Sequence, residues 1–249
     1  MPPEAAATAE APAKASSTAI EVSDLEAFYG ESHVLHGMSF AMEPGEVVTL
    51  LGRNGAGKST ALKALMGITP PQRRGSVKLL GEETIHLPSH RIAQMGLGYV
   101  PEERGIYASL TAEENLMLPP KVQEGGLSVE EIYKLFPNLR ERAQSQGTKL
   151  SGGEQQMLAI GRILRTGAHT LLMDEPTEGL APVIVQQIGN VIRQLKTQGY
   201  TILLVEQNFH FASTVADRHY IVEDGRVVDL IPNDQLDANM EKLKDYLAV

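Results

Sequence analysis

The N-terminal part of the chain alternates between apolar and polar positions. Residues 20–28 and 34–42 change character at nearly every step, and a period of two is typical of strands with one buried face. Pro44-Gly45 then predicts a turn. We therefore expect two half-buried strands that pair in an antiparallel sheet.

Further along, short apolar runs alternate with helical spacing. The runs at 46–51, 170–173 and 201–205 predict buried strands. Helical spacing predicts a helix over 59–66, and another from Pro182 to about Gln198, just before Gly199. Because strands that alternate with helices usually pair in parallel, the pattern predicts an α/β fold with a parallel sheet.

The middle of the chain has apolar residues at helical spacing. Residues 111–165 have helical spacing that is interrupted at Pro119-Pro120 and Gly125-Gly126. This predicts an inserted helical subdomain over about 103–165. Capping spacing occurs at three places, Thr111/Glu114, Ser128/Glu131 and Ser151/Glu154.

The two ends of the chain have other patterns. Residues 2–18 are almost entirely Pro, Ala, Ser, Thr and Glu, so residues 1–18 are predicted to form a disordered tail. Asp224-Gly225 predicts a hairpin turn within 220–228. We expect one domain over 19–249, with a C-terminal helix over about 234–248.

Composition narrows the possible classes of protein. The 249 residues are 42% hydrophobic and 21% charged, the profile of a folded soluble protein. The absence of cysteine excludes disulfides, a Cys-ligated metal and a thiol nucleophile. The net charge of −9 argues against a nucleic-acid partner. No apolar run approaches the ~18 to 20 residues that cross a bilayer, so any membrane role must come through a partner.

The strongest chemical signal is the pattern G-x-x-x-x-G-K-[ST] between a predicted strand and a predicted helix. There, backbone N–H groups and the helix N-terminus can surround phosphate oxygens. Lys58 is expected to neutralise the β and γ phosphates of a bound nucleotide, and Ser59 to ligate Mg²⁺. The residues of this phosphate loop are Gly52, Arg53, Asn54, Gly55, Ala56, Gly57, Lys58, Ser59 and Thr60.

The second motif is acidic and follows the predicted strand at 170–173. The sequence Leu171-Leu172-Met173-Asp174-Glu175-Pro176 places two carboxylates at the end of a buried strand. Asp174 is expected to hold the Mg²⁺ shell, and Glu175 to orient or deprotonate a water molecule. Alone, such a pair could be solvated loop charges, but the phosphate loop makes the metal interpretation the stronger one.

A third motif, at 150–156, reads L-S-G-G-E-Q-Q and begins a predicted helix. Ser151 with Glu154 can form a capping box, which is a purely structural role. Capping does not require Gly152-Gly153, whose bare N–H groups at a helix N-terminus suit a phosphate. Because the phosphate loop is already complete, we expect this second site to serve the nucleotide of another subunit.

Together these three motifs, in this order, resemble the ATP-binding subunits of ABC transporters, over about residues 20–230. The resemblance implies a P-loop NTPase (RecA-like) core, an N-terminal antiparallel β subdomain and an inserted helical signature subdomain. It implies that two subunits enclose two ATP molecules, each between one chain's phosphate loop and the other's signature. Tyr29 matches the aromatic residue that stacks on adenine in this family.

The chain departs from the commonest family pattern at three places. Glu102 stands where most members have Gln, Gln207 stands where most have a switch histidine, and the loop 177–182 reads T-E-G-L-A-P. These departures resemble one branch, the ATPase subunits of branched-chain amino acid importers. Glu175, Gln207 and Glu102 are thus the candidate catalytic residues. Gln207 cannot titrate as imidazole does, and His210 is interpreted as a surface histidine.

The resemblance also implies partners. These are two membrane permease subunits, a sister ABC ATPase and, indirectly, a periplasmic binding protein, at the cytoplasmic face of the inner membrane. Ile106, Tyr107 and Leu110 are expected to contact a membrane subunit, unless they pack inside the helical subdomain. The transported molecule is expected to be a branched-chain amino acid or a related small polar or organic acid.

Three other functions compete with this one. A lipopolysaccharide-export ATPase would be expected to keep the histidine that Gln207 replaces. A DNA-repair ATPase would need long coiled coils between Lys58 and Ser151, and no heptad pattern occurs there. The chain could also be a weakly hydrolysing regulatory partner of a second ATPase. The ATP turnover of the purified chain, alone and with its partner, would distinguish this function from that of a transport ATPase.

Overall fold

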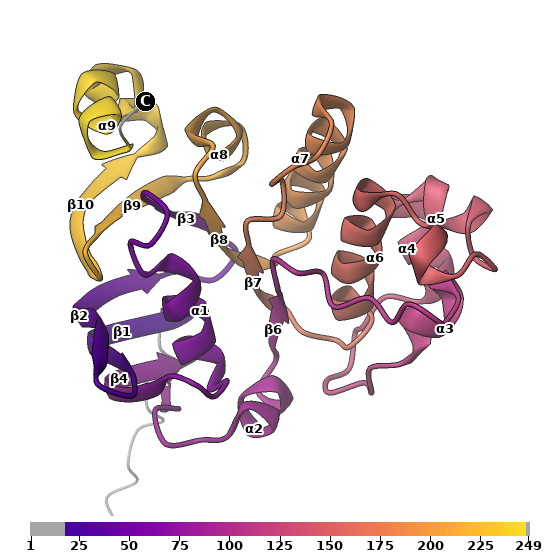
Figure 1. Ribbon diagram of the computed structural model, residues 1–249, viewed down its shortest axis with the longest axis horizontal. Coiled ribbons are helices and arrows are strands. Elements are labelled where there is room, and N and C mark those ends of the chain that lie inside the picture. The colour runs from indigo at the N-terminus through magenta and orange to yellow at the C-terminus, as the bar shows by residue number, and fades with distance from the viewer. Residues whose placement is uncertain (1–17, 248–249) are drawn as a thin grey trace, which may run out of the picture.

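The computed structural model describes residues 18–247, which form two sheets and their covering helices (Figure 1). The predicted disordered tail, apart from Thr18, lies outside the described residues. In Figure 1 the antiparallel sheet lies at one end of the long axis and helices α3 to α5 lie at the other. The parallel strands between them carry the candidate chemistry.

The predicted antiparallel sheet is confirmed. Strand β1 (Ile20–Tyr29) pairs with β2 (Ser32–Met42) and with β4 (Gln72–Leu79), and β4 also pairs with the short β5 (Glu82–Glu83). The alternating pattern places Val22, Leu25 and other apolar side chains of β1 in the core. This sheet packs its buried face against helix α1 and the main sheet.

The main sheet has six strands in the order β10-β9-β3-β8-β7-β6. The parallel pairing joins β9 to β3, β3 to β8, β8 to β7, and β7 to β6, and β10 is antiparallel to β9. The three central strands are buried along their whole length, as their apolar runs predict. The bounds are β3 Val47–Leu51, β6 Leu97–Val100, β7 Thr170–Asp174, β8 Thr201–Glu206, β9 Arg218–Glu223 and β10 Arg226–Pro232.

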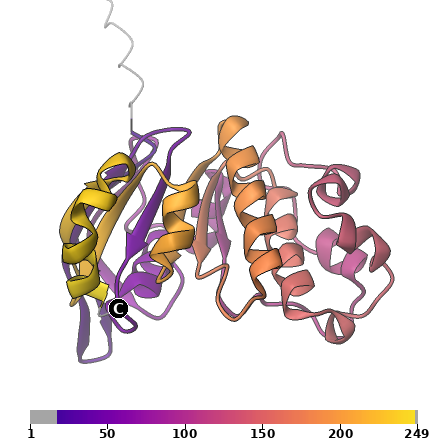
Figure 2. The ribbon, with the colours of Figure 1, turned by 90° about the horizontal axis from the view of Figure 1, so that it is seen from above.

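Helices connect the parallel strands. The predicted helix before Gly67 is α1 (Lys58–Met66), and Gly67 ends it with a left-handed φ of 67°. The long predicted helix is α7 (Pro182–Thr197), which buries an apolar face that includes Ile188, Ile192 and Leu195. Figure 2 shows α7 and the short helix α8 (Phe209–Val215) side by side along the main sheet. Helix α2 (Ser89–Gln94) precedes β6.

The predicted helical segment contains α3 (Ala112–Met117), α4 (Val129–Leu135), α5 (Pro137–Glu141) and α6 (Gly152–Leu164). A 3-10 turn at Gly147–Lys149 precedes α6. All three predicted capping boxes are present, at Thr111, Ser128 and Ser151. Buried Leu116, Ile132 and Phe136 share one core with α6 and with the parallel strands, so the helical segment is attached to the main sheet through α6.

The C-terminal segment is less regular than predicted. Two 3-10 turns, Asn233–Gln235 and Asp237–Asn239, precede α9 (Met240–Leu247), so the helix begins later than position 234. Asn and Asp favour turns over helix interiors because their side chains compete for backbone groups. The predicted last residue, at position 248, lies outside the described residues. Within residues 18–247 no helix has both the length and the apolar character that a membrane span needs.

Candidate functional site

The candidate site lies where four neighbouring parallel strands end. Strand β3 leads into the phosphate loop, β7 ends at Asp174, β8 ends at Glu206 just before Gln207, and β6 ends just before the segment that carries Glu102. Because parallel strands end at the same edge of a sheet, residues from four distant segments meet there. The parallel pairing, not the spacing along the chain, builds this site.

The phosphate loop has the backbone geometry that its glycines predict. Gly55 has φ 81° and Gly57 has φ 100°, both in the left-handed region that favours glycine. A side-chain carbon at position 57 would lie 2.8 Å from Cδ2 of Leu35. Among residues 18–247, apart from Gly55 and its two chain neighbours, no heavy atom lies within 4 Å of the corresponding position at Gly55. The loop is therefore tightly packed at Gly57, next to α1, and open at Gly55, where a ligand can approach the backbone.

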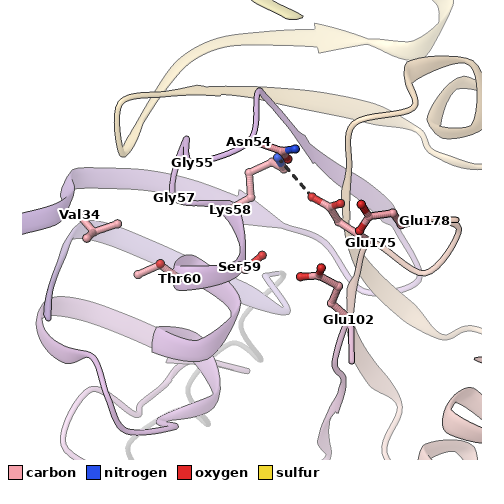
Figure 3. Close-up of a pocket in the computed structure, with 10 residues that line it drawn as sticks. All are labelled: Val34, Asn54, Gly55, Gly57, Lys58, Ser59, Thr60, Glu102, Glu175 and Glu178. Atoms are coloured by element: carbon pink, nitrogen blue, oxygen red, sulfur yellow. Dashed lines mark ion pairs between the residues drawn. The ribbon is translucent and has the colours of Figure 1, made fainter. Parts of the chain in front are cut away.

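A cavity of about 390 Å³ opens over this loop (Figure 3). It brings the phosphate loop together with Glu102, which follows β6, and with Glu175, which follows β7. Val34 and Glu178, which the motifs did not single out, also line it. The lining residues are Val34, Asn54, Gly55, Gly57, Lys58, Ser59, Thr60, Glu102, Glu175 and Glu178.

Lys58 lies inside this cavity and is almost fully buried. Its Nζ donates to the carbonyl oxygens of Gly52, at 2.8 Å, and Arg53, at 3.0 Å. It also forms an ion pair with Oε1 of Glu175 at 3.5 Å, drawn as the dashed line in Figure 3. Burial lowers the pKa of Lys58, and the carboxylate of Glu175 opposes that change. The lysine is thus held beside the loop by acceptors that a phosphate can replace.

Asp174 is held by two hydroxyl groups. Ser59 Oγ donates to Oδ1 at 2.8 Å, and the Tyr99 hydroxyl donates to Oδ2 at 3.0 Å. Burial raises the pKa of Asp174, while both hydrogen bonds act in the opposite direction. Ser59 and Asp174 are therefore adjacent, as a shared metal site requires. Tyr99 was not predicted, because its position on β6 says nothing about β7 until the two strands pair.

Glu175 contacts Gln207 directly. Gln207 Nε2 donates to Glu175 Oε2 at 2.8 Å, so the residue in the place of the usual switch histidine holds the candidate base. Glu175 has φ 44°, a left-handed conformation that is uncommon for a residue with a side chain. The structure thus constrains both the backbone and the side chain of Glu175. His210 is exposed, its ring contacts that of Phe209 at a tilted angle, and no hydrogen bond within residues 18–247 joins its side chain to Glu175 or Gln207.

A further carboxyl at this edge, that of Glu206, was missed by the sequence analysis. Glu206 is 3% exposed, and its Oε1 accepts a hydrogen bond from Thr177 Oγ1 at 2.8 Å. Burial raises the pKa of Glu206 to about 7. Glu206 therefore links the end of β8 to the loop that follows Glu175. An acidic residue that ends an apolar run was the available signal.

Other predicted site residues lie outside the cavity lining. Tyr29 is half-buried at the end of β1, and Ser151 is exposed at the start of α6. Glu154 accepts from the Ser151 backbone N–H at 2.7 Å in the capping box. Gly152 and Gly153 begin α6, and Gly153 packs on Ile184. In a single chain the signature segment and the phosphate loop are therefore separate.

The remaining predicted residues belong to the phosphate loop and to the expected docking segment, and they differ in exposure. The side chain of Arg53 turns away from the loop, and its Nε and Nη2 donate to the carbonyls of Tyr246 and Asp245 at 3.1 Å each. Ala56 and Gly52 are buried in the loop backbone. Tyr107 is 54% exposed, whereas Ile106 packs partly against the core, so the expected docking segment divides between surface and interior.

The fold and the site define a P-loop ATPase in which a glycine-rich loop, a lysine and a strand-end acid pair converge. Residues 35–178 match the family described as ABC transporter, and the chain belongs to that family. It is an ATP-binding subunit of the ABC type with ATP hydrolysis as its reaction.

Curated relatives match most of the chain. The "High-affinity branched-chain amino acid transport ATP-binding protein BraG" of Pseudomonas aeruginosa is 45% identical over 204 residues, which cover 81% of this chain and 87% of that protein. The "Probable branched-chain amino acid transport ATP-binding protein LivF" of Archaeoglobus fulgidus is 36% identical over 207 residues, 82% of this chain and 87% of that protein. A "Lipopolysaccharide export system ATP-binding protein LptB", from Acidithiobacillus ferridurans, is 33% identical over 214 residues, 80% of this chain and 84% of that protein.

Solved structures share the fold. An "ATP binding subunit of ABC transporter" is 29% identical, with a TM-score of 0.77, covering 93% of this chain and 100% of that chain. A dimeric ATP-binding cassette in a post-hydrolysis state, bound to ADP and Pi, is 25% identical with a TM-score of 0.76. That alignment covers 86% of this chain and 98% of the cassette. The predicted fold class is confirmed.

Proposed function

We propose that this chain hydrolyses ATP to drive an ABC importer for branched-chain amino acids or related small polar or organic acids. The observation that carries the enzymatic part is the convergence of Lys58, Ser59 and Glu175 at one cavity, with Asp174 hydrogen-bonded to Ser59 next to its lining. The transported class is supported by the 45% identity to the Pseudomonas aeruginosa relative. The 33% identity to the lipopolysaccharide-export relative supports that alternative less.

Nucleotide binding begins with the exchange of partners at Lys58. When the β and γ phosphates occupy the loop, Lys58 Nζ leaves the Gly52 and Arg53 carbonyls and donates to phosphate oxygens. The amides of Gly55 and Gly57 and the N-terminus of α1 add further donors. The ion pair between Lys58 and Glu175 weakens in the same step, which frees a carboxylate oxygen to face a water molecule.

The donor set at Ser59 and Asp174 fits Mg²⁺, a hard cation that prefers oxygen ligands. Ser59 Oγ would ligate the ion, and Asp174 would hold its shell, because these two oxygens already lie 2.8 Å apart. Glu102, which also lines the cavity, adds a third oxygen donor. When bound, Mg²⁺ would neutralise charge on the transferred phosphoryl group.

Hydrolysis needs a positioned base. Glu175 accepts the proton of the attacking water, and Gln207 keeps its carboxylate oriented through the 2.8 Å hydrogen bond. Gln207 donates this bond without titrating, so the contact persists over the whole physiological pH range. Glu175 is therefore the catalytic base in this proposal, and Gln207 acts on it as a positioning residue.

The proposed importer contains further subunits besides this chain. The open signature at Ser151 to Glu154 would enclose the ATP of a sister ABC ATPase, and Tyr29 would stack on the adenine of this chain's own ATP. Two permease subunits would anchor the pair at the cytoplasmic face of the inner membrane and receive substrate from a periplasmic binding protein. Exposed Tyr107, with Met117 and Leu118, offers an apolar contact for a permease.

The test is substrate-stimulated ATP hydrolysis. The chain is co-expressed with permeases and a second ABC ATPase of the branched-chain amino acid type from the same organism, and the complex is reconstituted in proteoliposomes with a binding protein of that type. Leucine, isoleucine or valine is expected to raise ATP turnover several-fold, and a complex with Lys58→Ala is the inactive control. Stimulation by lipopolysaccharide in place of amino acids would contradict the proposed transported class.

A further inference from the structure

A buried carboxyl ends an interior strand of the main sheet beside the candidate site. Glu206 is the last residue of β8 and is 3% exposed. Its backbone lies between two other strands, since Glu206 pairs with Leu51 of β3 and the preceding Val205 pairs with Asp174 of β7. A position on a strand is held more precisely than one on a loop. A buried carboxyl is unfavourable unless hydrogen bonds satisfy it, so its partners indicate what it does.

The carboxylate of Glu206 binds two different segments. Its Oε1 accepts from Thr177 Oγ1 at 2.8 Å, and its Oε2 accepts from the backbone N–H of Asn208 at 3.4 Å. Thr177 belongs to the loop 175–181 between β7 and α7 and is 6% exposed, whereas Asn208 is the N-cap residue of α8. One side chain on a rigid strand therefore joins the loop 175–181 to the turn 206–208.

The candidate base and its partner lie on the same two segments. Glu175 begins the loop and Gln207 lies in the turn, and Gln207 Nε2 donates to Glu175 Oε2 at 2.8 Å. Thr177 follows Glu175 by two positions, and Gln207 follows Glu206 directly. The two side-chain hydrogen bonds thus bridge the same pair of segments next to one another. A shift of either segment changes the distance between Gln207 and Glu175.

Packing alone does not hold these segments together. A cavity of about 1020 Å³ is lined by residues of α7 and α8 and by all four residues of the two side-chain hydrogen bonds. Residues 178–179, which follow Thr177, are exposed. Glu175 has a left-handed φ of 44°, a conformation that persists only where the surroundings enforce it. Because the cavity leaves room for movement, hydrogen bonds must fix the loop.

We propose that Glu206 is a positioning residue for ATP hydrolysis, which holds the loop 175–181 and the turn 206–208 at the separation where Gln207 orients Glu175. This inference rests on the proposed function, in which Glu175 is the base. Within residues 18–247, the lining of the phosphate-loop cavity includes neither Glu206 nor Thr177. Both residues therefore act through Glu175 and not on the nucleotide.

The alternative is that Glu206 only stabilises the fold. A residue with that role changes the melting temperature and the amount of folded protein, but it leaves kcat unchanged for the complexes that fold. A positioning residue instead lowers kcat and leaves KM nearly constant, because ATP is held by other groups. Kinetic constants of the folded complex therefore separate the two roles.

The experiment measures kcat and KM for ATP hydrolysis by the reconstituted complex. Glu206→Leu removes both acceptors at similar side-chain size, and Thr177→Val removes the hydroxyl at the other end of the bond. Glu206→Gln is the conservative variant, because its amide can accept from the Asn208 N–H and donate to Thr177 Oγ1. Thr177→Ser likewise keeps a hydroxyl. The matched control is Glu223→Leu, which replaces an exposed glutamate at the end of β9.

We expect Glu206→Leu and Thr177→Val each to lower kcat by about 10- to 100-fold, because a displacement of about 1 Å can cost a hundredfold in rate. KM should stay within about twofold of the parent, since the phosphate loop is unchanged. Glu206→Gln and Thr177→Ser should stay within about threefold of the parent kcat, because both can keep the hydrogen bond. Glu223→Leu should match the parent.

A double-variant cycle tests whether Glu206 acts through Gln207. In a complex that carries Gln207→Leu, the side chain at position 207 no longer orients Glu175. Adding Glu206→Leu to that complex should therefore lower kcat by no more than about a further twofold, because the two residues serve one contact. A combined loss equal to the product of the two separate losses would show independent effects and overturn the inference.

Two further results would overturn it. One is a parent-like kcat for Thr177→Val with a melting temperature within about 4 °C of the parent. The other is a rise in KM without a fall in kcat, which would place the effect on nucleotide binding. Thr177→Val keeps the test decisive if Glu206→Leu fails to fold, because valine has nearly the shape of threonine. Absence of ATP turnover in the parent complex, or parent-like turnover of Glu175→Gln, would instead contradict the proposed function.

Discussion

Replacement of Gln207 tests whether this residue acts through Glu175. Gln207→Leu keeps a side chain of similar size but removes the donor that lies 2.8 Å from Glu175 Oε2. The side chain of Glu175 is 9% exposed, so water replaces this donor poorly. A hydrogen bond to a charged group contributes about 1.5–3 kcal/mol, which corresponds to a loss of roughly 10- to 150-fold in kcat.

The assay is steady-state ATP hydrolysis by the reconstituted complex over a range of ATP concentrations. Gln207→Leu should lower kcat with little change in KM, because the lost contact is to the base and not to the nucleotide. Gln207→His restores a donor and adds a group that can contact the γ-phosphate, so it should raise kcat above that of the parent. The matched control is Gln194→Leu, an exposed glutamine on α7.

Equal kcat values for the parent and Gln207→Leu would refute the assigned role of the hydrogen bond. A rise in KM without a change in kcat would place Gln207 on the nucleotide instead of the base. A neutral or lower rate for Gln207→His, with intact folding, would show that the glutamine site is not weakened relative to a histidine site. The pH profile gives an additional readout, because only the histidine variant should gain a titration near pH 6 to 7.

Three further predictions concern buried charged groups. Lys58→Ala should lower ATP affinity by at least 100-fold, because it removes the cation that faces the phosphates, and micromolar binding in calorimetry would contradict this. Glu175→Gln should keep ATP affinity within a few-fold and lower turnover at least 100-fold; parent-like turnover would exclude Glu175 as the base. Burial raises the pKa of Glu206 from 4.5 to about 7, so the folded state binds the extra proton and the free energy of unfolding should fall as pH rises from 4.5 to 7. Glu206→Gln should lose this fall, which is at most about 3 kcal/mol, and parallel melting profiles of the two proteins would contradict it.

Local features of this structure could be predicted from the sequence, because they depend on residues that lie close together along the chain. The left-handed glycines of the phosphate loop, the capping boxes at Thr111, Ser128 and Ser151, and the Asp224-Gly225 turn depend on residues a few positions apart. Apolar runs bury strands wherever they lie in the core, so the parallel sheet also followed from the pattern. The start of α9 did not, because the Asn and Asp residues interspersed among better helix formers at 233–239 leave that boundary to local competition.

Contacts between distant segments were decided by the tertiary structure alone. Tyr99 reaches Asp174 because β6 pairs with β7, and Thr177 reaches Glu206 because β7 pairs with β8. The motif position of Gln207 predicts a role at the site, but its hydrogen bond to Glu175 depends on the same pairing. A sequence specifies which strands are buried, since burial depends on each run's own composition. It does not show which strand ends are neighbours, because that depends on how all the strands pack at once.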